Sequence, residues 1–85
     1  MNDNKDAIYR QIGAKIVYYR TLRKMTQAEL AEKVHMSQSS IGRIERGKYN
    51  SSIPISTLLD IAEGLGVKFS SLVTFNKEEE ILAKY

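Results

Sequence analysis

The sequence predicts an all-α fold of five helices around one core. Apolar residues recur at intervals of three and four, which is the helical period, and no segment shows the alternation typical of a strand. One proline and five glycines among 85 residues are too few for a turn-rich all-β fold. Because 42% of the residues are hydrophobic, the chain can bury one modest core, and we expect a single domain.

The first helix is expected over residues 6–24. Its apolar stripe has the helical spacing and consists of Ile8, Ile12, Ile16 and Tyr19. Acidic residues lie near the start of this segment and basic residues near its end, which is the arrangement that the helix dipole favours.

Two short helices joined by a tight turn follow. Thr26 is the expected N-cap of the second helix, and Glu29, three residues later, completes a capping box. Ser37 is the expected N-cap of a third helix from Gln38 to Arg46, which Gly47 ends.

A fourth and a fifth helix are expected after the loop at residues 48–54. Pro54 suits the first turn of the fourth helix, where its missing N–H costs nothing, and Gly66 ends that helix. The buried stripe of the fourth helix consists of Leu58, Ile61, Ala62 and Leu65. The fifth helix is expected over Phe69–Val73.

Composition excludes several classes of site. The chain has no cysteine and one histidine, which excludes disulfides and thiolate zinc sites and argues against a histidine triad. No apolar run approaches the length of about 18 residues that a membrane span needs, and the first residues do not resemble a signal peptide. We therefore expect a cytoplasmic protein with no metal, cofactor, small-molecule ligand or membrane partner.

The charge is distributed unevenly along the chain. Residues 1–50 carry a net charge of +5, whereas residues 51–85 carry a net charge of −2. Basic charge that is concentrated in one part of a small domain indicates a polyanionic partner.

Residues 26–46 have the properties of two crossed helices. Ala31 supplies the small residue that such a crossing needs, and Ile41 and Ile44 supply the inner face of the second helix. The outer face is expected to carry Gln38, Ser39, Gly42, Arg43 and Arg46. Because these residues are small or polar and none is acidic, the helix can enter a DNA major groove about 12 Å wide.

The stretch TQAELAEKV…SQSSIGRIERG resembles the motif of the XRE-like helix-turn-helix family, the lambda/434 repressor and Cro type of regulators. The flanking segments IGAKIVYYR and LLDIAEGLGV also match, so the resemblance covers about residues 12–73. It implies a repressor-like DNA-binding domain over residues 1–75, followed by a tail or short extra helix at residues 76–85. The implied function is a sequence-specific transcriptional regulator that binds double-stranded DNA, with a palindromic operator, as a homodimer.

The resemblance also implies roles for individual residues. Gln38, Ser39 and Arg43 match the base-reading positions, where glutamine suits adenine and arginine suits guanine. The expected contacts to the DNA backbone are Thr26, Gln27, Ser40, Arg46, Lys48, Tyr49 and Asn50. Of these, Gln27 matches a glutamine that binds a phosphate and braces the recognition helix.

Two structural features are implied in the same way. Arg20 and Glu45 match a pair in which an arginine late in the first helix reaches a glutamate near the end of the recognition helix. Arg23, in contrast, is expected to be exposed and to contribute little to stability. His35 occupies a turn position that is usually glycine, where φ tends to be positive.

The C-terminal part is richer in apolar residues than a five-helix core requires. These residues, which form the expected dimer interface, are Val73, Phe75, Ile81, Leu82 and Tyr85. In the matched family the dimer contact lies around the fifth helix, and Ile81 and Tyr85 would share one face of a helical tail. That face would cover either the first helix of its own chain or a partner subunit, and the three glutamates at residues 78–80 favour the partner.

Two other classes of function compete with DNA binding. Helix-turn-helix folds also serve as protein-docking modules or antitoxin-type partners with little independent DNA binding, but a docking face would expose Leu, Met or Phe on residues 38–46. An enzyme would need a nucleophile–base pair, a phosphate-binding loop or a supported carboxylate dyad, and the sequence offers none. The sequence therefore favours a DNA-binding regulator over a docking module and over an enzyme.

Overall fold

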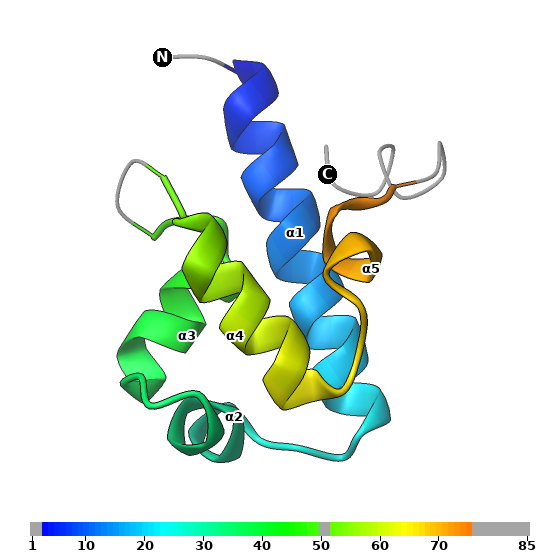
Figure 1. Ribbon diagram of the computed structural model, residues 1–85. Helices are drawn as coiled ribbons and strands as arrows, with labels where there is room; N and C mark the ends of the chain where they lie inside the picture. Colours follow the sequence, from blue (N-terminus) through cyan, green and yellow to red (C-terminus); the bar gives the residue numbers. More distant parts are fainter. Residues whose placement is uncertain (1–2, 50–51, 76–85) are drawn as a thin grey trace.

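The computed structural model describes residues 3–49 and 52–75, and within these ranges the chain forms five helices and no strand (Figure 1). The helices are α1 (Asp3–Leu22), α2 (Gln27–Lys33), α3 (Gln38–Glu45), α4 (Ile55–Leu65) and α5 (Phe69–Val73). The predicted all-α, five-helix fold is therefore confirmed. The extra helix considered for residues 76–85 falls outside the described residues. None of the described helices combines the length and the apolar character that crossing a membrane requires.

Side-chain caps begin α2 and α3 where the sequence predicts them. The Thr26 hydroxyl accepts a hydrogen bond from the Glu29 N–H at 3.0 Å, and the Thr26 N–H donates to the Glu29 carboxylate at 2.8 Å. The hydrogen bond from the Thr26 N–H, and secondly the interaction of the carboxylate with the Thr26 hydroxyl, lower the pKa of Glu29. At α3, the Ser37 hydroxyl accepts from the Ser40 N–H at 3.0 Å. Pro54 is the N-cap of α4, with an extended ψ of 143°, and so lies one residue outside the predicted first turn.

Residues in the left-handed conformation end four of the helices. They are Lys24, His35, Gly47 and Gly66, with φ between 55° and 72°. After each of them, the next N–H donates to a carbonyl five residues earlier, as in a Schellman motif. The positive φ expected at His35 is confirmed. Lys24 adopts the same conformation without a glycine to signal it, and α1 therefore ends at Leu22 and not at residue 24.

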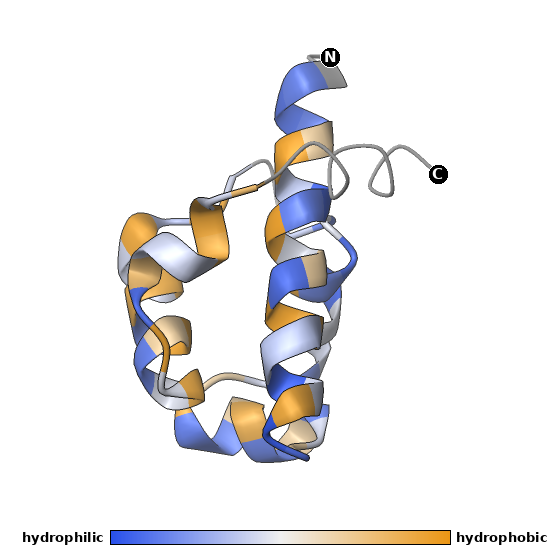
Figure 2. Cartoon of the chain, turned by 90° about the vertical axis from the view of Figure 1, so that its right-hand side faces the viewer, coloured by the Kyte–Doolittle hydropathy of each residue, from blue (hydrophilic) through white to orange (hydrophobic). Residues whose placement is uncertain are grey.

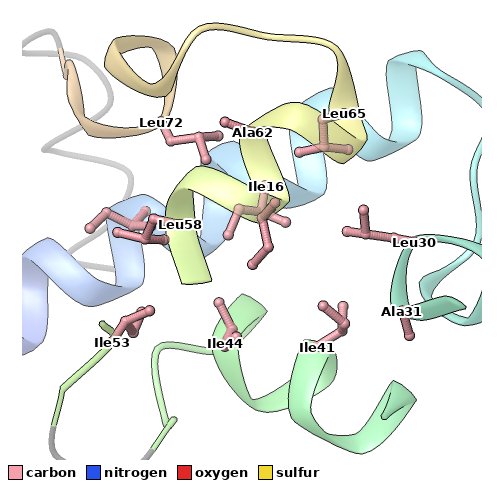
Figure 3. Packing of buried hydrophobic residues seen from close by; sticks show 12 residues of the cluster. Ile16, Leu30, Ala31, Ile41, Ile44, Ile53, Leu58, Ala62, Leu65 and Leu72 are labelled. Atoms are coloured by element: carbon pink, nitrogen blue, oxygen red, sulfur yellow. The ribbon is translucent and has the colours of Figure 1, made fainter. Parts of the chain in front are cut away.

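The core lies between α1 and the other helices (Figure 3). It contains Ile12, Ile16, Leu30, Ala31, Ile41, Ile44, Ile53, Leu58, Ile61, Ala62, Leu65 and Leu72. Ile16 is fully buried and lies centrally among side chains from the other four helices. Along α1, hydrophobic residues recur at intervals among hydrophilic ones, as expected for a helix with one apolar face (Figure 2).

The apolar stripe of α1 has the predicted helical spacing but is not buried along its whole length. Ile8 is 45% exposed, because the first turns of α1 extend beyond α3 and α4 (Figure 1). Burial of an apolar residue requires a packing partner, and the helical period alone does not supply one.

A hydrogen-bonded cluster of three side chains, here called the Glu45 cluster, joins α1, α2 and α3. Arg20 Nε donates to Glu45 Oε2 at 2.7 Å, and Arg20 Nη2 donates to Glu45 Oε1 at 3.2 Å. The Gln27 amide donates to the same Oε1 at 2.8 Å. The side chains of Arg20 and Glu45 are 16% and 4% exposed, so the carboxylate is almost withdrawn from water. Three charge-assisted or amide hydrogen bonds offset the desolvation of this ion pair.

Gly13 lets the backbone of α1 touch the last turn of α3. A Cβ atom on Gly13 would lie 2.6 Å from the carbonyl oxygen of Ile44 and 2.7 Å from the carbonyl carbon of Glu45. Because both of these atoms belong to the backbone, any side chain at Gly13 would push α3 away from α1. The sequence carried one signal of this contact, a glycine inside a helical pattern.

Arg23 has a larger role than its exposure suggests. Its side chain is exposed, as expected, but Nε donates to the carbonyl of Leu65 at 3.0 Å and Nη2 to that of Gly66 at 3.4 Å. Arg23 therefore supplies donors to carbonyl groups at the C-terminal end of α4, which helix geometry leaves without partners.

The Glu45 cluster generates a stability prediction. Glu45→Ala should lower the free energy of unfolding by about 3 kcal/mol, because it leaves the Arg20 guanidinium largely buried without its counter-charge. The measurement is urea denaturation followed by far-UV circular dichroism. Glu32→Ala, which removes an exposed glutamate from α2, is the matched control and should change stability by less than about 0.5 kcal/mol. Equal unfolding midpoints for the two variants would show that the cluster does not hold the helices together.

Candidate nucleic-acid interface

The second helix of the motif presents a polar face to solvent. Gln38, Ser39 and Arg43 are all exposed, and the first two lie in the first turn of α3. Arg43 lies one turn further on, and its Nη1 donates to the Ser39 hydroxyl at 3.3 Å. The three predicted base-reading residues therefore share the exposed side of one helix.

Glu45 is the one acidic residue of α3, and the Glu45 cluster turns its carboxylate away from this face. As a result, the exposed face of α3 carries a cation and neutral polar groups without a competing anion. This arrangement is compatible with a polyanion and with the hydrogen-bonding edges of bases.

The expected position of Gly42 on the outer face is wrong. Gly42 is buried, and a Cβ there would lie 3.7 Å from Gln27 Nε2 and 3.2 Å from Arg46 Nη1. The side of α3 that contains Gly42 is covered by Gln27 of α2, which lies over it on the way to Glu45. Gly42 thus lies at the contact between the two helices and not on the face that is open to solvent.

The expected DNA-backbone residues lie around the two helices of the motif. Thr26, Arg46 and Lys48 are exposed, Gln27, Ser40 and Tyr49 are half-buried, and Asn50 lies outside the described residues. The Ser40 hydroxyl accepts hydrogen bonds from Ser37 at 2.9 Å and from Arg43 Nη2 at 3.4 Å. Arg43 also lies over the ring of Tyr49, with 5.9 Å between Cζ and the ring centroid.

The expected dimer-interface residues are only partly described. Val73 and Phe75 are half-buried and pack against the core from the end of α5. Ile81, Leu82 and Tyr85 fall outside the described residues. No group of three or more histidine or acidic side chains in the described ranges is placed to hold a metal ion.

Comparison with known proteins identifies the family. The helix-turn-helix family HTH_3 matches residues 16–72. An immunity repressor of Bacillus phage phi105 is 43% identical over 72 residues, which cover 81% of this chain and 49% of the repressor. An HTH-type transcriptional regulator of Methanocaldococcus jannaschii is 37% identical over 65 residues, which cover 76% of this chain and 96% of that protein.

The fold has counterparts among solved structures. The crystal structure of a hypothetical transcription factor, NHTF, from Neisseria matches with a TM-score of 0.76 over 88% of this chain and 84% of that one. At 23% identity, this match shows a shared fold. The chain spans about half the length of the phage repressor that it matches. The resemblance inferred from the motif is confirmed, and the chain belongs to the XRE-type helix-turn-helix family of transcriptional regulators.

Proposed function

We propose that this chain is a sequence-specific regulator of transcription that binds double-stranded DNA by placing α3 in the major groove. The observation that carries the proposal is the polar, non-acidic face of α3, with Gln38, Ser39 and Arg43 exposed and Glu45 paired internally. Membership of a family of transcriptional regulators supports it.

In the proposed complex, different residues position the protein and read the sequence. Gln38 suits a bidentate contact with adenine, and Arg43 suits one with the O6 and N7 atoms of guanine. Contacts to phosphates from Thr26, Ser40, Arg46, Lys48, Tyr49 and Asn50 would set the register of α3 without reading the bases. The net charge of +5 on residues 1–50 would attract the DNA at long range.

Gln27 can serve both of its expected purposes at once. Its amide nitrogen carries two N–H groups, and one hydrogen bond is directed at Glu45. The second N–H could donate to a phosphate. Gln27 would then contact both the Glu45 carboxylate of α3 and the DNA backbone.

A protein-docking function has less support on the face of α3. The large hydrophobic side chains that are exposed in the described ranges are Ile8, Tyr18, Leu22, Ile55 and Leu59. These residues belong to α1 and α4 and not to α3. A docking surface formed by them would therefore not explain the polar face of α3.

The base-reading role of Arg43 is tested with DNA sites selected from a random pool. Arg43→Ala should weaken binding to the selected site about 10- to 100-fold, the usual value of a bidentate base contact. Binding to random DNA should change by less than about threefold. Lys48→Ala, which removes an exposed cation expected at a phosphate, should weaken both to the same degree. Fluorescence anisotropy measures both affinities, and equal losses for Arg43→Ala on the two DNAs would make Arg43 a backbone contact.

We further propose that the chain acts as a homodimer on a palindromic operator. A two-fold pair places its recognition helices about 34 Å apart, which matches one turn of DNA. Val73 and Phe75 supply apolar surface at the end of α5, and the sequence adds Ile81, Leu82 and Tyr85 beyond it.

Truncation tests the dimer. A chain that ends at Asn76 should shift toward monomer in sedimentation velocity at micromolar concentration, because it lacks the apolar residues of the tail. It should also lose more affinity for a palindromic site than for an isolated half-site. A truncated chain that remains dimeric would rule out a role of the tail in dimerisation.

A further inference from the structure

The guanidinium of Arg43 contacts three side chains, those of Ser39, Ser40 and Tyr49. Its Cζ lies 5.9 Å from the centroid of the Tyr49 ring, within the range of a cation–π interaction. Nη1 donates to the Ser39 hydroxyl at 3.3 Å and Nη2 to the Ser40 hydroxyl at 3.4 Å. Each of these nitrogen atoms has a second N–H, and Nε has one more, so donors remain for a base edge.

The backbone after α3 determines where the Tyr49 ring lies. Gly47 adopts a φ of 72°, and the Lys48 N–H donates to the carbonyl of Arg43 at 2.8 Å, which fixes the turn at the end of α3. A Cβ on Gly47 would lie 2.9 Å from Arg10 Cγ, so the turn packs closely against α1. Tyr49 is itself half-buried against the core. The ring therefore belongs to the packed part of the molecule, although it lies in the segment that leaves α3.

We propose that Tyr49 is a specificity-determining positioning residue, whose ring holds Arg43 ready to contact a guanine. This inference rests on the proposed base-reading role of Arg43. An arginine side chain has many rotamers, and immobilising it on binding costs free energy, which a preformed contact reduces. The two interactions are compatible, because the guanidinium stacks through its face and donates through its edge. A phosphate contact by the Tyr49 hydroxyl would be a separate property of the same residue.

The discriminating quantity is the ratio of affinities for the selected site and for the same site with the guanine read by Arg43 replaced by adenine. Tyr49→Phe keeps the ring and should keep this ratio within the error of the measurement. Tyr49→Leu keeps an apolar side chain against the core but removes the ring, and should lower the ratio about two- to fivefold. In an Arg43→Ala background, Tyr49→Leu should leave the ratio unchanged, because the side chain that the ring positions is absent.

A measurement on the free protein separates positioning from folding. The heteronuclear NOE of the Arg43 side-chain Nε–H should fall in Tyr49→Leu and stay at its wild-type value in Tyr49→Phe. Backbone amide signals of α3 report whether Tyr49→Leu retains the fold. With the fold retained, an unchanged NOE would overturn the inference.

The DNA results decide between the remaining outcomes. If Tyr49→Leu keeps the wild-type ratio of affinities, the ring has no positioning role. If Tyr49→Phe lowers this ratio as much as Tyr49→Leu does, the effect belongs to the hydroxyl and not to the ring. If Arg43→Ala relaxes discrimination while Tyr49→Leu does not, this inference fails and the proposed function stands. If the wild-type protein selects no site from random DNA, both fail together.

Discussion

The position of α3 depends on the Glu45 carboxylate. It receives two hydrogen bonds from Arg20 of α1 and one from Gln27 of α2, so the end of α3 is joined to both preceding helices. The same interaction decides the chemistry of the exposed face, because it withdraws the one acidic residue of α3 from that face. The placement of α3 and the proposed function thus both involve this partly buried ion pair. The two charges can remain in a poorly hydrated site because they are paired and hydrogen-bonded. If one partner is removed, the burial of the remaining charge becomes strongly unfavourable.

Close backbone packing reinforces this attachment. Gly13 brings α1 onto the last turn of α3, and Gly42 lies under the Gln27 side chain. Gly64 brings α4 close to Val34, which follows α2. A Cβ on Gly64 would lie 2.7 Å from Val34 Cγ1. At Gly13 and at Gly64, a Cβ would come closer to the neighbouring element than van der Waals contact allows. In the DNA-binding function that we propose, such rigidity matters because a base contact tolerates little displacement of the side chain that makes it. Arg43 has the longest side chain among the three residues that we propose to read bases. It contacts Ser39, Ser40 and Tyr49.

Local signals in the sequence predicted most of the fold. Thr26 with Glu29, Ser37 and Gly66 each mark a helix end through contacts within a few residues, and the helices begin or end there. Features set by distant residues were not predictable in this way. Ile8 has the helical spacing but is 45% exposed, and Gly42 faces Gln27 and not solvent. Arg23 reaches carbonyls 42 and 43 residues away. The expectation of a pair between Arg20 and Glu45, 25 residues apart, came from the family resemblance, because no local pattern indicates it.

The proposed function requires that the exposed face of α3 read bases in the major groove. Methylation interference on a site selected from random DNA tests this claim most directly, because dimethyl sulfate methylates guanine at N7, in the major groove, and adenine at N3, in the minor groove. Our account predicts that methylation of a guanine N7 in each half-site blocks binding by the wild-type protein. It also predicts that methylation of adenine N3 at the same base steps is tolerated. Interference confined to adenine N3, or absent at every guanine of a site that the protein selects, would contradict the account.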